Sequence, residues 1–215
     1  MEKAGRGSAH RRNGIAGAEL ALGSTADGER ARLGDDGGRL ALLVDGVVQS
    51  VAVDGADLGE SYWSAMVPDV RPRSALLLGL GAGTIARLLT DRFGPVPIVG
   101  VERDPAVVAL GRAHFGLDLP NLEVVVEDAF AFVDTCSQTF DLIGVDLYDG
   151  LVLARGTLAK PFLRRLRALL APGGCVVLNL TLSRRLPRQL HRLSQVFHVA
   201  RTVDAGFNVV VYCQE

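Results

Sequence analysis

Two aspartates in the stretch DLIGVDLYDG are the residues of this chain best suited to chemistry. Asp146 and Asp149 flank Tyr148 directly after an apolar run that reads as a strand. A carboxylate can hold a protonated amine, whose pKa is about 10, and can then accept a proton as the nitrogen attacks an electrophile. The pair therefore indicates an amine substrate, with Tyr148 as a wall of its pocket. In the alternative interpretation, Asp149-Gly150 is only a turn and Asp146 acts alone.

Three glycines interrupt the apolar stretch LLLGLGAGTIARLL, at Gly79, Gly81 and Gly83. Each glycine loses backbone entropy on folding, so a backbone this bare points to a ligand that approaches it closely. Glu102 follows the next expected strand, about 20 residues beyond the loop, where a carboxylate can accept hydrogen bonds from both hydroxyls of a ribose. Asp128 follows the third strand and can accept a hydrogen bond from an adenine amino group. These positions predict an adenosine-containing ligand.

The same glycines are also compatible with a second type of ligand, a nicotinamide dinucleotide. GAGTIA satisfies the pattern G-x-G-x-x-A, which also occurs in nicotinamide dinucleotide sites. A dinucleotide site does not need paired carboxylates at the tip of the fourth strand, whereas an amine substrate does. The residues after the strands therefore favour a nucleoside with an amine beside it.

Strand and helix patterns alternate from Arg73 onward, which predicts βαβ units and a parallel sheet covered on both faces. The expected strands are Ala75–Leu78, Pro97–Val101, Leu122–Val126, Leu142–Val145 and Cys175–Leu180. The expected helices are near Gly83–Arg92, Pro105–Phe115, Ala129–Thr135 and Leu158–Leu170. The runs FHVARTV and FNVVVY predict an antiparallel strand pair at the C-terminus. The fold class is thus α/β, Rossmann-like and doubly wound, with a mainly parallel sheet.

The N-terminal part has a different composition. Residues 1–38 are rich in glycine, alanine and charge without a sustained period, and we expect a disordered leader there. RLALLVDGVVQSVAV predicts a β-hairpin with a two-residue turn at Asp45-Gly46, and a short helix should end near Pro68. The expected division is a leader at 1–38, a hairpin and short helix at 39–70, and a nucleoside-binding α/β domain at 71–215.

Composition argues against several classes of protein. The net charge of −1 gives no general attraction to nucleic acid or anionic membrane. The three cysteines are far apart and lack C-x-x-C spacing, which argues against a disulfide framework or a zinc site, so we expect no metal. No apolar run approaches the roughly 18 residues of a membrane span, and we expect a cytoplasmic protein. The arginine-rich run SRRLPRQLHRL is typical of a solvated helix face, so nucleic acid is not an expected partner.

At these residues the chain resembles the polyamine aminopropyltransferases, the spermidine synthase family, which are built on the class I S-adenosylmethionine (SAM) methyltransferase fold. The resemblance covers about residues 39–213 and begins with LLVDGVVQS, which is similar to the family's L-x-x-D-G-x-x-Q hairpin. LLLGLGAG resembles the family's glycine loop, GVERDPAVV its ribose-binding strand end and VEDAFAFV its adenine-contacting segment. FDLIGVDLYDG resembles the motif Y-D-x-I-x-x-D-x-x-D, whose first aspartate helps the amine to lose its proton and whose second binds the polyamine.

The resemblance implies a role for each matched position. It assigns catalysis to Asp146 and Asp149, nucleoside contacts to Gln49, Gly79, Gly81, Gly83, Glu102, Asp128 and Ala129, and a substrate pocket to Tyr62, Trp63 and Tyr148. It also implies SAM or decarboxylated SAM as the co-substrate, a small amine or polyamine as the acceptor, and a homodimer as the assembly.

Three departures separate this chain from the family pattern. Ala82 stands where the family has an aspartate that grips the aminopropyl amine of decarboxylated SAM. Aligned on Met66, the family's Y-x-E-M signature reads Trp63, Ser64 and Ala65 here, without the glutamate. The family's D-P-x-G-P after the second aspartate is also missing. Two alternatives therefore stay open: a SAM-dependent methyltransferase acting on a small molecule, and a catalytically degenerate nucleoside-binding module.

Overall fold

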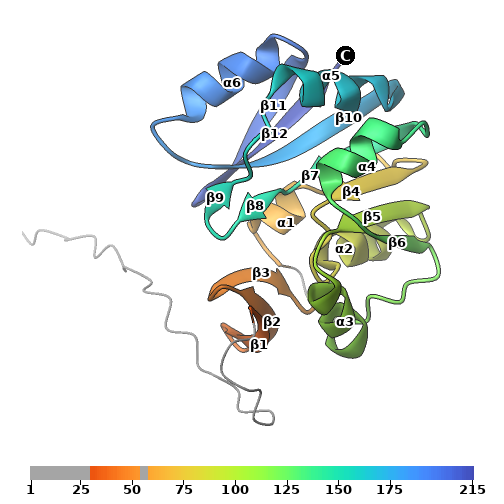
Figure 1. The fold of residues 1–215 in the computed structure, drawn as a ribbon, viewed down its shortest axis with the longest axis vertical. Coiled ribbons are helices and arrows are strands. Elements are labelled where there is room, and N and C mark those ends of the chain that lie inside the picture. The colour runs from red at the N-terminus through yellow and green to blue at the C-terminus, as the bar shows by residue number, and fades with distance from the viewer. Residues whose placement is uncertain (1–29, 54–57) are drawn as a thin grey trace, which may run out of the picture.

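A seven-stranded sheet forms the centre of the protein (Figure 1). The computed structural model describes residues 30–53 and 58–215, and the strand order in the sheet is β11-β12-β10-β7-β4-β5-β6. Its strands are β4 (Ala75–Leu78), β5 (Ile98–Glu102), β6 (Leu122–Val126), β7 (Phe140–Val145), β10 (Leu170–Thr181), β11 (His198–Ala205) and β12 (Asn208–Gln214). Strands β6, β5, β4, β7 and β10 run parallel, whereas β12 pairs antiparallel with both β10 and β11. The expected sheet and its antiparallel C-terminal pair are confirmed.

The strand order reverses at β4, and this reversal decides where a ligand can bind. From β4 the chain builds outward through β5 and β6, and it then returns to add β7 and β10 on the other side of β4. Ligands of doubly wound sheets bind at such a switch point, beyond the carboxyl ends of the strands. The glycine loop after β4 and the aspartates after β7 therefore meet at one place.

Helices cover both faces of the sheet. Their bounds are α1 (Tyr62–Ala65), α2 (Thr84–Phe93), α3 (Pro105–His114), α4 (Ala129–Thr135), α5 (Lys160–Ala168) and α6 (Leu186–Ser194). Alternate residues of β4 enter two separate core clusters, because successive side chains of a strand point to opposite faces. Leu76 and Leu78 pack with α4, α5 and α6, whereas Ala75 and Leu77 pack with α1 and α2. No described helix is long and apolar enough to cross a membrane.

The N-terminal unit is a three-stranded antiparallel sheet, not the single hairpin that the sequence predicted. Its strands are β1 (Ala31–Asp36), β2 (Arg39–Val44) and β3 (Val47–Val51). The Asp45-Gly46 turn is confirmed, but the leader was wrong for 31–38, where β1 pairs with β2. Gly37 and Gly38 both have positive φ, as a tight two-residue turn requires, so glycines interpreted as disorder are a second hairpin turn. The remaining leader residues, 1–29, lie outside the described residues.

Two further differences lie close to the site. A small hairpin of β8 (Tyr148–Asp149) and β9 (Val152–Leu153) follows β7, where the sequence indicated at most a turn. Strand β10 begins at Leu170 and not at the expected Cys175. Its register with β7 shifts between these two residues, so the APGG segment lies inside the strand as an irregular stretch. Helix α5 correspondingly ends at Ala168.

The N-terminal sheet is fixed to the glycine loop by side-chain hydrogen bonds from β3. The amide of Ala82 donates to Ser50 Oγ at 2.9 Å. Thr84 Oγ1 accepts from the amide of Val51 at 3.0 Å and donates to the carbonyl of the same residue at 2.9 Å. Both hydroxyl residues are buried, so these bonds exclude water from the junction. The strand that carries Gln49 is thereby held over the loop.

We expect the substitution Thr84→Val to destabilise the protein by about 1–3 kcal/mol, because it leaves a buried amide and carbonyl of Val51 without partners. Urea unfolding followed by circular dichroism measures this loss. The matched control is Thr135→Val on α4, where an exposed hydroxyl bonds only carbonyls of its own helix. Equal losses in the two variants would contradict the role given to the Thr84 hydroxyl.

Candidate active site

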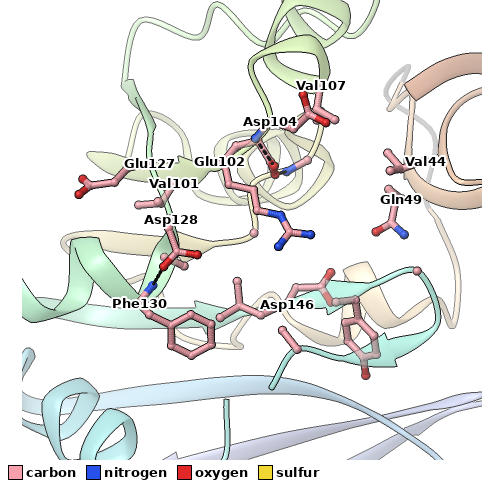
Figure 2. A pocket seen from close by; sticks show the side chains of 18 of the residues that line it. Val44, Gln49, Val101, Glu102, Asp104, Val107, Glu127, Asp128, Phe130 and Asp146 are labelled. Carbon is pink, nitrogen blue, oxygen red and sulfur yellow. Dashed lines mark hydrogen bonds between the residues drawn. The ribbon is translucent and has the colours of Figure 1, made fainter. Parts of the chain in front are cut away.

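A pocket opens at the carboxyl ends of β4, β5, β6 and β7 and is bordered on one side by the N-terminal sheet (Figure 2). Figure 2 shows Gln49 entering from the N-terminal sheet, Glu102 and Asp128 from neighbouring strand ends, and Asp146 between them and the β8–β9 hairpin. The predicted residues that line the pocket are Gln49, Gly79, Gly81, Glu102, Asp128, Ala129, Asp146 and Tyr148. The structure thus brings most of the predicted site together.

Glu102 is held rigidly at the centre of the pocket. Its Oε2 accepts from the amide of Gly81 at 2.9 Å, and its Oε1 accepts from the amide of Asp104 at 3.1 Å. Each carboxylate oxygen can accept more than one hydrogen bond, so both remain able to accept from a pair of neighbouring hydroxyls. This geometry supports the prediction that Glu102 binds a ribose.

The glycine loop is shaped by close contacts with its neighbours. A Cβ on Gly79 would collide with the carbonyl oxygen of Asp146, and one on Gly81 would lie 2.6 Å from Ser50 Oγ. Both glycines also have positive φ, which side chains rarely tolerate. Gly83 does not line the pocket: it caps α2, and a Cβ there would strike Leu117. Its nucleoside contact stays a prediction, and the close packing against Leu117 is the need for glycine that the structure shows.

The α4 N-terminus forms the far wall of the pocket. Asp128 Oδ1 accepts from the amides of Phe130 and Ala131, at 2.9 and 3.1 Å, and so caps the helix. Oδ2 remains available to a ligand such as an adenine amino group. Phe130 also lines the pocket, and its ring is fixed against Phe162 at a centroid distance of 4.7 Å. Aromatic and carboxylate groups therefore meet where an adenine is expected.

Asp146 is the residue with the most perturbed carboxyl in the site. Burial raises its pKa to about 6, and the nearby charge of Glu102 acts in the same direction. Hydrogen bonds from Asn179 and Tyr62 lower the pKa and oppose that shift. Asn179 Nδ2 donates to Asp146 Oδ1 at 2.9 Å, and Asn179 Oδ1 accepts from Asn208 Nδ2 at 2.8 Å. The carboxylate is thus oriented and ready to accept a proton near neutral pH.

The aromatic residues predicted to form the substrate pocket have three different positions. Tyr148 lines the pocket, but its hydroxyl bonds the Asn179 carbonyl and Thr181 Oγ1, each at 3.2 Å, and burial raises its pKa to about 12. Tyr62 does not line the pocket and reaches it through its bond to Asp146. Trp63 also lies outside the lining, packed between the N-terminal sheet and the cluster around α1 and α2. Its predicted contact with substrate is not supported.

Asp149 has a partner that the sequence analysis missed. It is exposed at the end of β8, outside the pocket lining, and forms an ion pair with Arg103, which does line the pocket. Arg103 directly follows Glu102, so the ion pair spans from the end of β5 to the β8–β9 hairpin. In this structure Asp149 therefore pairs with a cation of the protein itself and lies outside the lining that contains Asp146.

Two of the residues that sequence reasoning missed carried a signal. Asn179 is a polar residue within the apolar run CVVLNL, and its burial shows that it serves the site rather than the surface. Arg103 stands next to the predicted ribose carboxylate, where a charge has no structural need. Arg30 also lines the pocket and pairs with Asp45 at 2.9 Å, but it lies within the segment interpreted as a leader. Nothing in its sequence neighbourhood indicated a site residue.

Fold and site together define a doubly wound α/β domain with a carboxylate-bearing pocket at its switch point. The chain belongs to the spermine/spermidine synthase family: the family model described as "Spermine/spermidine synthase domain" matches residues 63–205. A polyamine aminopropyltransferase of Mycobacterium tuberculosis is 34% identical over 191 residues, which cover 84% of this chain and 35% of the relative. The corresponding protein of Moorella thermoacetica is 31% identical over 178 residues, with 74% and 60% covered. The chain thus spans between a third and three-fifths of these relatives.

Solved structures with the same fold include both enzyme types. A probable spermidine synthase from Corynebacterium glutamicum superposes with a TM-score of 0.76 at 24% identity, covering 91% of this chain and 81% of that one. A spermidine synthase in complex with the transition-state analogue AdoDATO gives a TM-score of 0.70 at 16% identity, covering 93% and 72%. A TehB-like SAM-dependent methyltransferase from C. glutamicum gives 0.53 at 23% identity, covering 75% and 90%. At these identities the likeness establishes the fold.

The raised pKa of Asp146 has a consequence for stability. Between its ordinary value of 3.8 and about 6 the native state retains a proton that the unfolded state has lost, so the free energy of unfolding falls as pH rises through this window. Asp146→Asn should lack this component. Asn179→Leu removes a hydrogen bond that lowers the pKa, and should therefore raise the midpoint of Asp146 above that of the wild type.

Carbon-13 NMR of the aspartate carboxyls, titrated with pH, measures these midpoints. Asn208→Ala is the control, because it leaves the bond from Asn179 to Asp146 in place and should have the smaller effect. A midpoint near 4 in the wild type, or no increase in Asn179→Leu, would contradict this account of the site.

Proposed function

We propose that this chain is a spermidine synthase-like transferase that moves an alkyl group from a SAM-type sulfonium nucleoside to an amine. The observation that carries the proposal is the position of Asp146, a carboxylate of raised pKa at the switch point and on the same pocket as Glu102. The family match and the names of the curated relatives support the same chemistry. Under this proposal the donor is decarboxylated SAM and the transferred group is aminopropyl.

The reaction needs little covalent work from the protein. The lone pair of the amine nitrogen attacks the carbon bonded to sulfur, the carbon–sulfur bond breaks, and its electrons neutralise the sulfonium as a thioether. Asp146 holds the incoming ammonium, accepts its proton and so frees the lone pair. Alignment of nitrogen, carbon and sulfur supplies most of the acceleration.

The remaining pocket residues would bind and orient the nucleoside. Glu102 would accept both ribose hydroxyls, and Asp128 Oδ2 would accept from the adenine amino group beside Phe130. Gln49, held by the junction of β3 with the glycine loop, would close the nucleoside from the opposite side. Gly79 and Gly81 would let the tail of the donor lie against the backbone.

One observation favours methyl transfer from SAM as a second candidate. Ala82 is buried, packs with Leu42 and Val107, and has its amide occupied by Ser50. The aspartate that would grip an aminopropyl amine at this position in the family is therefore absent, and no charged side chain replaces it there. The carboxylate of SAM would therefore meet no negative side chain from position 82, whereas an aspartate there would repel it.

The identity of the released nucleoside distinguishes the two donors. We expect incubation with decarboxylated SAM and putrescine to release methylthioadenosine, whereas methyl transfer from SAM would release S-adenosylhomocysteine; mass spectrometry separates them. Asp146→Asn should lower turnover by about a hundredfold or more, since it removes the proton acceptor. Its affinity for the donor, measured calorimetrically, should stay within about twofold of the wild type. Release of neither product, with no donor bound, would refute the proposed function.

The ion pair of Arg103 with Asp149 should limit the use of diamines. Arg103→Gln frees Asp149 to bind a second ammonium, so we expect KM for putrescine to fall up to about fivefold, as for an exposed ion pair, while kcat stays nearly constant. Adding Asp149→Asn should cancel the gain, and KM for a monoamine such as propylamine should not change. Arg112→Gln, which breaks the exposed pair of Arg112 with Asp118, is the matched control. An unchanged KM for putrescine would show that Asp149 does not face the acceptor.

A further inference from the structure

A second cavity lies behind the β8–β9 hairpin, between that hairpin and α6. It has a volume of about 830 Å³, and Ala154 lines both this cavity and the nucleoside pocket. In Figure 1 the hairpin, the carboxyl end of β10 and α6 border one side of the molecule. Five arginines line it, from the segment after β9, the loop after β10 and α6: Arg155, Arg184, Arg185, Arg188 and Arg192. We call this cavity the arginine groove.

Within the part of the chain that the structure describes, the arginine groove carries positive charge without an acidic partner. No aspartate or glutamate is among its lining residues, and within residues 30–53 and 58–215 none of the five arginines forms an ion pair. All five are exposed. Five positive charges gathered along one cavity attract an anionic ligand, and binding of such a ligand would reduce their mutual repulsion. Arginine forms paired hydrogen bonds with carboxylates and phosphates. The expected occupant of the groove is therefore negatively charged.

The apolar part of the groove narrows the choice of anion. Leu151 and Val152, at the tip of the hairpin, are 72% and 64% exposed, and Leu153 and Leu158 continue the apolar lining inward. Gln189 also lines the groove, and its buried Oε1 has no hydrogen-bond donor in the described structure. The occupant must therefore offer apolar groups and N–H donors as well as negative charge.

We propose that the arginine groove docks an acidic, leucine-bearing peptide segment of a partner protein. Glutamate or aspartate side chains would pair with the arginines, apolar side chains would cover Leu151 and Val152, and backbone N–H groups would satisfy Gln189. Nucleic acid fits less well because no aromatic residue lines the groove to stack on a base. A second copy placed face to face would oppose two sets of unpaired arginines, and a flat anionic membrane would not enter a hollow groove.

Fluorescence anisotropy with a labelled peptide of four Glu-Glu-Leu repeats tests the proposal without using the enzyme's substrates. We expect saturable binding that weakens with salt and falls at least about tenfold when glutamine replaces glutamate in the probe, or serine replaces leucine. Arg185→Glu with Arg188→Glu should weaken binding at least about tenfold. Leu151→Ser should weaken it without changing the thermal unfolding midpoint, because this side chain is exposed.

The matched control reverses two arginines outside the groove, Arg71→Glu with Arg164→Glu, and should change the affinity by no more than about twofold. Both control residues are exposed and form no ion pair in the described structure. Equal weakening by both double variants would overturn a specific site, as would no binding of the probe. Tighter binding of a uridine-tract RNA or of phosphatidylserine vesicles, lost in the groove variant, would overturn the peptide assignment.

Discussion

The close approach of three backbone segments around the loop after β4 is the constraint on which the site depends. Gly79 lies against the carbonyl of Asp146, and Gly81 lies against the hydroxyl of Ser50. A single methyl group at either position would separate β7 or the N-terminal sheet from the loop. Because Glu102 is anchored on the amide of Gly81, the same approach also fixes the carboxylate that is proposed to bind the ribose. The glycines therefore position protein groups as much as they make room for a ligand.

Asp146 shows how a buried network can set a carboxyl between two protonation states. Burial alone would favour a neutral acid, which could not hold a cation, whereas full exposure would leave a weaker base. The bonds from Asn179 and Tyr62 reduce the effect of burial, and Asn208 donates to the amide oxygen of Asn179 from the other side. Asn179 and Asn208 lie on the neighbouring strands β10 and β12, so the C-terminal part of the sheet also sets the surroundings of Asp146.

What could be predicted from the sequence followed from local patterns. The alternation of strand and helix patterns predicted the parallel sheet. The residues directly after β4, β5, β6 and β7 predicted the position of the pocket, because the carboxyl ends of parallel strands meet at one edge. Gly83 and Trp63, which were predicted to contact ligands, lie outside the pocket lining and pack against Leu117 and the N-terminal sheet, which are distant from them in the chain. Strand β1 was missed because its short run of ARLGDD has little apolar character and is ordered by pairing with β2.

The two halves of the pocket differ in how they depend on sequence. The nucleoside half is built from short motifs whose functional atoms are fixed by neighbouring amides, as for Glu102 and Asp128. The part of the pocket proposed to hold the acceptor is built from long-range pairs, such as that of Asn179 with Asp146. Arg103 neutralises Asp149 from another strand end, so a motif with both aspartates present offers only one unpaired carboxylate to an amine. Under the proposed function, the second aspartate of this chain would bind an amine only when its pair with Arg103 opens.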